Sequence, residues 1–242
     1  MVEGAELLSA AFAAGMSVES VYLAPGGRSN PMVAAVVERV FAAGTRVFDL
    51  APGVIERIAD TVTPQPVVAV VGFSPKEMQE VRRASMVLVC ADVRDPGNAG
   101  TMIRTADASG CDAVVFCAGA VDPTNPKTVR ASAGSLFQVP VAAGGEPEEV
   151  VGHLRSWGFV TVGTAARGGI DYAEFDWRRP LALVFGNEAS GLGSTLTDAL
   201  DESVTIPMAG RAESLNVSVS AAVLCFEALR QRQAPSATEV SP

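Results

Sequence analysis

Apolar and polar positions alternate along the first part of the chain in short runs of helical and strand-like spacing. A Pro-Gly-Gly turn at 25–27 separates two of these runs. The pattern predicts helices over 6–14, 31–43 and 53–59, and strands over 18–23, 46–48 and 67–71. We therefore expect a small α/β domain over residues 1–71. The stretch 72–84 is more charged and poorer in apolar residues, and we expect a linker there.

The second part of the chain alternates strand-like runs with helical or glycine-rich stretches. This order is typical of a parallel sheet whose strands are joined by crossover connections. The predicted strands cover 86–90, 113–116, 139–141, 159–163, 181–185 and 203–206. The fold class is therefore α/β, with a larger parallel-sheet domain over 85–233.

The last long helix is predicted over 214–231, and it is apolar nearly all round between 217 and 226. A helix without a polar face is buried on more than one side, so we expect it to pack on the sheet and on a second copy of the chain. The closing residues 234–242 are rich in Pro, Ser and Thr and are expected to form a flexible tail.

Composition excludes several classes of protein. The chain has 242 residues, of which 48% are hydrophobic, and no apolar run approaches the about 18–20 residues of a membrane span. Its first residues lack the features of a signal or transit peptide, so we expect a cytoplasmic protein without a membrane partner. One histidine, His153, and four cysteines without C-x-x-C spacing make a metal site improbable and favour buried thiols.

The net charge of −9 argues against a protein that coats nucleic acid, because that binding depends on many Lys and Arg side chains. A local basic site stays possible. Lys76 and Lys127 are the only lysines among 18 basic residues, so phosphate contacts would come mainly from arginine.

Three stretches rich in Gly and Asn follow or close predicted strands, where ligands bind in α/β proteins. In the first, Pro96 and Gly97 set a turn, so a helix is expected to begin near Asn98 with Asn98 as its cap. Arg104 lies nearly two turns further on. A capped helix with a surface arginine and a ligand site both fit this pattern.

The second stretch, 184–193, carries Glu188 in a loop whose glycines allow a ligand to approach the backbone. The third, 206–220, places Ser214 and Asn216 where the last helix begins, so these side chains either cap the helix or bind a ligand. The chain has neither a G-x-G-x-x-G fingerprint after its first strand nor a G-x-x-x-x-G-K-[ST] loop, which disfavours NAD- and ATP-dependent enzymes.

Taken in this order, the three stretches resemble the SpoU (TrmH-like) branch of the SPOUT superfamily, whose members are knotted RNA 2′-O-ribose methyltransferases dependent on S-adenosylmethionine (AdoMet). The resemblance covers 86–232. It rests on Asn98-x-Gly100-x-x-x-Arg104-Thr-Ala, Phe185-Gly186-Asn187-Glu188-x-x-Gly191-Leu192 and Ile206-Pro207-Met208…Glu213-Ser214-Leu215-Asn216-Val217-Ser218. Residues 127–141 also look like the family. Val2-Glu3-Gly4 and 64–70 are similar to the ribosomal-protein-like substrate-binding domain of many members.

The resemblance implies a deep trefoil knot, an exception to the rule against knots, and a homodimer whose knot helices pack together. It also implies AdoMet as the cofactor, held largely by backbone groups. By position, the cofactor-binding residues would be Gly163, Thr164, Ala165, Gly186, Asn187, Glu188, Gly191, Ile206, Pro207, Met208, Ser214, Leu215 and Asn216.

The family places its first-motif arginine, here Arg104, at the reacting hydroxyl. A guanidinium is a poor base, so holding the hydroxyl and stabilising the developing alkoxide is the easier role, although a role as base stays open. Asn98 and Glu188 would orient Arg104 or the ribose, and Ser214 and Asn216 would complete the catalytic site. No metal is needed for this reaction.

Family members with this accessory domain usually have a basic stretch before Val-Glu-Gly, whereas this chain starts on it. We therefore expect RNA contacts to depend on arginines, namely Arg28, Arg82, Arg83, Arg94 and Arg130. Ribosomal RNA is the preferred substrate and transfer RNA the second choice. A methylation of ribosomal RNA that confers antibiotic resistance is also compatible with the sequence.

Two other functions fit the same motifs: a non-catalytic dimer that binds AdoMet and RNA, and a methyltransferase that acts on a substrate other than RNA. Retention of all five predicted catalytic residues argues against the non-catalytic dimer, while the acidic charge slightly favours the non-RNA substrate. Arg104→Ala separates enzyme from binding module, because only an enzyme would lose turnover.

Overall fold

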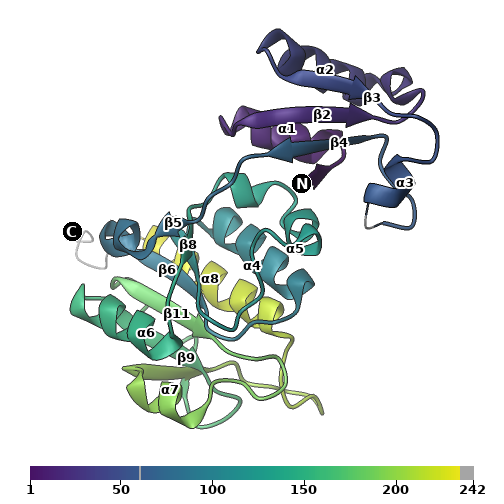
Figure 1. Ribbon diagram of the computed structural model, residues 1–242. Coiled ribbons are helices and arrows are strands. Elements are labelled where there is room, and N and C mark those ends of the chain that lie inside the picture. Colours follow the sequence, from purple (N-terminus) through teal and green to yellow (C-terminus); the bar gives the residue numbers. More distant parts are fainter. Residues whose placement is uncertain (60, 235–242) are drawn as a thin grey trace, which may run out of the picture.

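The computed structural model describes residues 1–59 and 61–234, and it contains two β-sheets that lie side by side (Figure 1). The first sheet has four strands in the order β1-β4-β2-β3. The second has eight strands in the order β10-β12-β9-β11-β6-β7-β8-β5, and every pairing in it is parallel. The expected α/β class, with a parallel sheet in the second part and a small sheet domain in the first, is confirmed.

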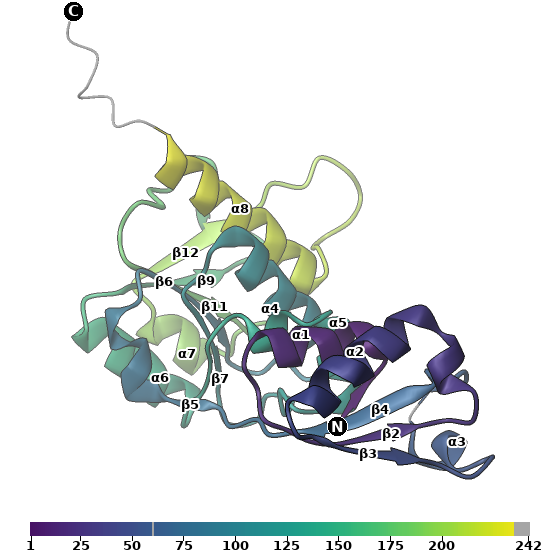
Figure 2. The same cartoon turned by 90° about the horizontal axis from the view of Figure 1, so that it is seen from above.

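The four-stranded sheet is covered by helices on one face. Figure 2 shows α1 and α2 on the same side of its strands. Val21, Leu23, Val67 and Ala69 point toward these helices and are buried. The elements are β1 (Val2–Glu3), α1 (Ala5–Ala13), β2 (Val18–Leu23), η1 (Gly27–Ser29), α2 (Pro31–Ala42), β3 (Arg46–Asp49), α3 (Ile55–Ile58) and β4 (Val67–Val71).

The eight-stranded sheet begins inside the stretch expected to be a linker, because β5 at 76–77 pairs with β8 at the sheet edge. The elements are β5 (Lys76–Glu77), η2 (Met78–Arg83), β6 (Met86–Cys90), α4 (Pro96–Ser109), β7 (Ala113–Phe116), α5 (Pro126–Ala131), η3 (Ser135–Phe137), β8 (Val141–Ala143), α6 (Pro147–Ser156), β9 (Val160–Thr164), β10 (Ile170–Asp171), β11 (Leu181–Phe185), α7 (Ser194–Ala199), β12 (Glu202–Thr205) and α8 (Val217–Gln233).

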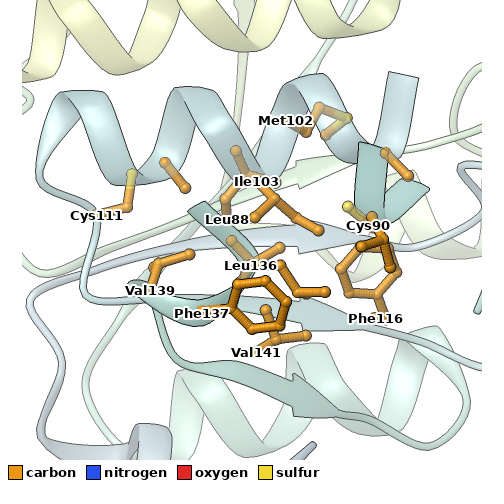
Figure 3. Packing of buried hydrophobic residues seen from close by; sticks show 14 of the residues in the cluster. Leu88, Cys90, Met102, Ile103, Cys111, Phe116, Leu136, Phe137, Val139 and Val141 are labelled. Atoms are coloured by element: carbon orange, nitrogen blue, oxygen red, sulfur yellow. The ribbon is translucent and has the colours of Figure 1, made fainter. Parts of the chain in front are cut away.

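Both faces of this sheet are covered, and each face has its own hydrophobic cluster. Alternate residues of β6, such as Leu88 and Val89, enter different clusters because successive strand side chains point to opposite faces. α4 and α8 contribute to one cluster, while α6 and α7 contribute to the other. Figure 3 shows Met102 and Ile103 of α4 above Leu88, in the same cluster as Phe116 and Leu136. All residues of β6 and β11 are consequently buried.

The start of α4 corrects one expectation. Asn98 is not the cap: Asp95 is, and its Oδ1 accepts a hydrogen bond of 2.8 Å from the backbone N of Asn98. Pro96 occupies the first helical position, where its missing N–H costs nothing. The helix therefore begins earlier than expected, and the Asn98 side chain is left to make other contacts.

The start of the last helix differs from the expectation in the other direction. α8 begins at Val217, later than the predicted 214, with Asn216 as its cap. α8 packs on α4 and buries Ala221, Leu224 and Cys225. Residues 1–59 and 61–234 leave its opposite side uncovered, with Val219 and Phe226 both nearly half exposed. The trefoil knot stays a prediction. Apart from Ala234, the predicted tail 234–242 lies outside the described residues.

The two sheets meet where α5 lies against β1. Here Arg130 Nη1 is 3.8 Å from the buried Glu3 Oε2. The other carboxylate oxygen of Glu3 accepts hydrogen bonds from Thr61 Oγ1 and from the backbone N of Gln65. This partly buried ion pair joins the small sheet domain to the part of the chain that forms the parallel sheet.

All four cysteines are buried. Neither 1–59 nor 61–234 includes a helix with the length and apolar character to span a bilayer. The same residues hold no group of three or more His, Cys, Asp and Glu that would bind a metal ion.

Candidate cofactor pocket and catalytic site

Three loops meet beyond the carboxyl ends of β9, β11 and β12 and enclose a pocket of about 420 Å³. This is the place where open parallel sheets bind ligands. The pocket is lined by Thr164, Ala165, Ala166, Gly186, Asn187, Glu188, Ala189, Ser190, Gly191, Leu192, Thr197, Ser203, Val204, Ile206, Met208, Glu213, Ser214, Leu215, Val217 and Ser220.

Most residues expected to bind the cofactor line this pocket. They are Thr164, Ala165, Gly186, Asn187, Glu188, Gly191, Ile206, Met208, Ser214 and Leu215. Gly163, Pro207 and Asn216 are not among the lining residues, and their cofactor contacts stay predictions. Gly163 has a packing role instead: a Cβ there would lie 2.5 Å from Leu200 Cδ1 and 2.8 Å from Leu192 Cδ1. Glycine thus lets two leucines close over the end of β9.

Several lining residues were not among the predicted cofactor-binding residues, including Ala166, Leu192 and Ser220. Leu192 is itself part of the second motif, so the motif was a usable signal for it. Ser220 carries no local signal, because only the first turn of α8 passing over the loops brings it to the pocket.

The loop after β11 is folded tightly on itself. Asn187 and Gly191 exchange two backbone hydrogen bonds, of 3.0 and 2.8 Å. Asn187 Oδ1 accepts from the backbone N of Ala189 and of Ser190. Gly191 has a φ of 66°, a conformation that other residues rarely adopt. The resulting loop presents Glu188 at a defined position.

A chain of side-chain hydrogen bonds joins three distant segments beside the pocket. Asn98 Nδ2 donates to Glu188 Oε1 at 3.1 Å, and Asn216 Nδ2 donates to Asn98 Oδ1 at 2.9 Å. Ser218 Oγ donates to Asn216 Oδ1 at 2.6 Å and lies 3.4 Å from Asn98 Oδ1. The structure therefore brings together α4, the β11 loop and the start of α8.

The Glu188 carboxylate is held in its ionised form. Partial burial opposes ionisation, but hydrogen bonds from the Asn98 amide and from the backbone N–H groups of Asp95 and Arg94 outweigh it, so the pKa of Glu188 is lowered. Glu188 is thus a fixed negative charge and hydrogen-bond acceptor at the pocket.

Gly100 of the first motif positions α4, the helix that carries Asn98. A Cβ at this position would lie 2.5 Å from Ala131 Cβ and 2.5 Å from the Thr128 carbonyl oxygen of α5. The absence of a side chain lets α5 pack directly on α4. The spacing of Asn98 and Gly100 therefore places the polar group toward the pocket loops and the bare backbone toward α5.

Models of two families match the chain. The SpoU rRNA Methylase family matches residues 85–226. A model described as RNA 2'-O ribose methyltransferase substrate binding matches residues 1–76. The chain belongs to the SpoU rRNA methylase family.

Relatives with curated names support this membership. The chain is 39% identical over 183 residues to the 23S rRNA (guanosine(2553)-2'-O)-methyltransferase RlmP of Bacillus subtilis. The aligned residues cover 76% of this chain and 72% of the relative. It is 36% identical over 196 residues to the 23S rRNA (uridine(2479)-2'-O)-methyltransferase of Streptomyces viridochromogenes, covering 78% and 68%.

Solved structures of the family have the same fold. An AdoMet-bound rRNA methyltransferase from Sinorhizobium meliloti superposes with a TM-score of 0.84 at 31% identity, covering 96% of this chain and 87% of the other. AviRb from Streptomyces viridochromogenes, in complex with AdoMet, gives a TM-score of 0.81 at 33% identity, with 96% and 89% covered.

The pocket of this SpoU family member fits AdoMet in size and charge. Its volume lies within the range of about 300–1,000 Å³ for small-molecule sites. The carboxylates of Glu188 and Glu213 line it, and its described lining residues include neither Lys nor Arg. This environment suits a sulfonium cation and is unsuited to a phosphate-rich cofactor. Leu192, Leu215 and Ile206 supply apolar surface.

The five predicted catalytic residues divide into three groups. Asn98, Glu188 and Asn216 belong to the hydrogen-bonded chain, and Ser214 lines the pocket. Arg104 is exposed on α4 and has no side-chain hydrogen bond or ion pair within the described residues. Ser218, which the motif includes but to which the sequence assigned no role, joins this hydrogen-bonded chain from two positions beyond Asn216.

The predicted RNA-binding arginines lie on different elements. Arg94 is beside the pocket, where its Nε is 2.7 Å from Asp92 Oδ1. Arg28 Nε is 3.8 Å from Asp49 Oδ1 on the small sheet domain. Arg82 and Arg83 are exposed on η2. Arg130 instead faces Glu3 at the contact between the two sheets.

Proposed function

We propose that this protein is an AdoMet-dependent methyltransferase that transfers a methyl group to a ribose 2′-hydroxyl of ribosomal RNA. The observation that carries the proposal is the hydrogen-bonded chain Glu188–Asn98–Asn216 beside a pocket that fits AdoMet. Two named relatives are 23S rRNA 2'-O-methyltransferases, which supports ribosomal RNA over transfer RNA. We expect the protein to act in the cytoplasm, since its substrate is ribosomal RNA.

AdoMet supplies an electrophilic methyl group on its sulfonium sulfur. The residues of this chain have to align the 2′-hydroxyl oxygen with that carbon and help the hydroxyl proton to leave. The lowered pKa of Glu188 makes its carboxylate a weak base, so its main task is to hold Asn98 and a cationic cofactor. Arg104, whose side chain is exposed, would hold the hydroxyl or its phosphate and stabilise the developing alkoxide.

We further propose a homodimer through α8. Val219 and Phe226 are 46% and 47% exposed and lie two turns apart on the side of the helix away from Leu224 and Cys225. Exposed apolar side chains in one stripe are typical of a subunit contact. Phe226→Glu is expected to convert the dimer to a monomer in analytical ultracentrifugation, whereas an unchanged mass would refute this contact.

The division into domains follows from the same proposal. We assign residues 1–71 to RNA substrate binding and 85–233 to the methyltransferase domain, with 72–84 as the connecting segment that also adds β5 to the edge of the eight-stranded sheet. The family matches over 1–76 and 85–226 support this division. The acidic charge still favours a local RNA contact over a broad one.

The experiment combines calorimetric titration with AdoMet and tritiated-methyl transfer to total ribosomal and transfer RNA. We expect AdoMet binding, label in the ribosomal RNA and loss of transfer by Arg104→Ala with cofactor affinity retained. Full transfer by that variant would overturn the role of Arg104. AdoMet binding without transfer to either RNA would favour a binding module or a non-RNA substrate, and label in transfer RNA alone would change the substrate.

A further inference from the structure

The sheet face of the small domain away from α1 and α2 is only partly covered: Ser20 and Val68 are buried on it, whereas Val70 and Phe48 are more than a third exposed. Strand register places Tyr22 of β2 directly opposite Phe48 of β3. Both side chains point to this face, because Val21 and Leu23 beside Tyr22, and Val47 beside Phe48, pack in the core under the helices. The two rings are stacked, with centroids 5.4 Å apart and planes 20° from parallel.

This stack ends at the edge of the sheet. β3 is the last strand in the order β1-β4-β2-β3, and no further strand pairs with it in residues 1–59 and 61–234. Tyr22 on β2 stacks on Phe48 from the inner side, and β3 has no neighbouring strand on its outer side within the described residues. Phe48 is accordingly 41% exposed, a high value for a ring held in a strand.

Two arginines flank Phe48. Arg46 is exposed two residues earlier on the same strand, so its side chain leaves from the same face. Arg28 lies near the other end of β3, where it approaches Asp49 and is more than half exposed. Arg46 therefore places a guanidinium on the same face as Phe48, whereas Arg28 approaches the end of the strand beside Asp49, whose side chain points to the opposite face.

We propose that the outer face of Phe48 is a stacking site for one unpaired base of the RNA substrate, with Arg46 and Arg28 contacting the adjoining phosphates. A base would extend the Tyr22–Phe48 stack by one ring, as bases do on exposed aromatic side chains. The inference rests on the proposed function and deepens it, because it names unpaired nucleotides as part of the substrate. The substrate-binding family match over 1–76 contains all four residues.

The alternative occupant of a sheet edge is a strand from another protein. β3 has only four residues, and it begins with the exposed Arg46 and ends with the exposed Asp49. Short strands with charged side chains are the features by which proteins block strand addition. The edge is therefore better suited to a flat aromatic base than to a backbone partner.

The test uses a short single-stranded RNA oligonucleotide that carries one 2-aminopurine base, and the same sequence annealed to its complement. Stacking quenches the fluorescence of 2-aminopurine, so the titration reports both affinity and stacking. Phe48→Leu removes the aromatic face while keeping apolar volume. Phe41→Leu is the matched control, because Phe41 is an exposed phenylalanine of the same domain that lies on α2, outside the stack.

We expect Phe48→Leu to weaken binding of the single strand by about 5- to 150-fold and to abolish quenching. Phe41→Leu and Phe48→Trp should bind as the unchanged protein does. In methyl transfer, Phe48→Leu should raise the KM for RNA and leave kcat and AdoMet affinity unchanged. This pattern would support the stacking site, since a structural defect would weaken single-strand and duplex binding alike and would leave quenching intact at saturating protein.

Equal binding of Phe48→Leu and unchanged protein to the single strand would overturn the proposal, as would an equal loss of binding to single strand and duplex. A changed oligomeric state with unchanged RNA affinity would identify the edge as a protein contact and would also overturn it. The proposed function fails separately, because its failure is the absence of methyl transfer by the unchanged protein.

Discussion

The two sheets of this protein differ in how many of their faces are covered. The eight-stranded sheet has α4 and α8 on one face and α6 and α7 on the other, and its strands β6 and β11 are wholly buried. The four-stranded sheet has α1 and α2 on one face, and all four residues of β3 are exposed or half-buried. A sheet covered on both faces can offer a ligand only its carboxyl edge, whereas a half-covered sheet also offers a face.

The strand sequences differ in the same way as the coverage of the two sheets. β11 reads Leu-Ala-Leu-Val-Phe without a polar residue, as strands buried on both faces do. β3 reads Arg-Val-Phe-Asp, and Phe48 is the apolar residue on its open side. We infer that the closed sheet positions the chemistry and the half-open sheet selects RNA. The following predictions separate these roles, from the largest expected effect to the smallest.

Loss of the Asn98 side chain should impair catalysis at the carboxyl edge of the eight-stranded sheet, while RNA binding by the four-stranded sheet is unchanged. Asn98→Ala removes the central member of the Glu188–Asn98–Asn216 chain. We expect kcat to fall about 10²-fold because the catalytic loops lose alignment, with RNA affinity retained. Steady-state kinetics at saturating RNA measure this.

Asn30→Ala is the control for that loss, since Asn30 caps α2 with the same kind of side chain. It should lower stability through the lost cap and leave kcat unchanged. Equal kcat losses in both variants would mean that the effect of Asn98 is structural rather than positional.

Two valines compare burial in the two sheets directly. Val184 of β11 is fully buried, while Val70 of β4 is 37% exposed. Val184→Ala should lower the free energy of unfolding by about 2–3 kcal/mol, because two methyl groups leave a cavity that the covered sheet cannot fill. Val70→Ala should cost less than about 1 kcal/mol. Urea denaturation measures both, and similar costs would contradict the contrast between closed and half-open sheets.

The ion pair between the sheets provides a third test. Arg130→Met leaves the buried Glu3 carboxylate without its cation, and we expect a loss of about 1–2 kcal/mol in the free energy of unfolding. Arg178→Met is a matched control, because Arg178 is also 3.8 Å from its carboxylate, Asp176, but both partners are more than half exposed. That control should change stability by less than about 0.5 kcal/mol, and an equal loss would contradict the role of burial.

The smallest expected effect concerns pH. The pKa of Glu188 is lowered in the folded protein, so its contribution to stability is present above the ordinary pKa of about 4.5 and is lost as the pH falls through the folded value. Glu188→Gln should therefore lose less stability than the unchanged protein between neutral pH and pH values below 4.5. Thermal melting across this range measures the difference, and identical acid profiles would refute it.

Sequence reasoning worked best where a pattern is local. The runs at 86–90 and 181–185 agree with β6 and β11 to the residue, because an uninterrupted apolar run marks a buried parallel strand. It erred at helix starts, where Asp95 and not Asn98 caps α4. Asn98, Glu188 and Asn216 were singled out by helix-start and loop patterns and then by the resemblance, but no local rule would have joined them. Ser218 stands in the third motif, yet nothing local to it predicts its hydrogen bond to Asn216.

The sequence by itself determined the α/β class, the approximate positions of the longer strands and the three loops that hold the candidate chemistry, because hydrophobic period and glycine placement act over a few residues. The two-residue strands β1, β5 and β10 are too short to show such a period. Only the tertiary structure decided which polar groups share hydrogen bonds, that Gly163 makes room for Leu192 and Leu200, and that Phe48 stands at a sheet edge beside Tyr22. These outcomes depend on strand order and register, which bring together residues that are far apart along the chain.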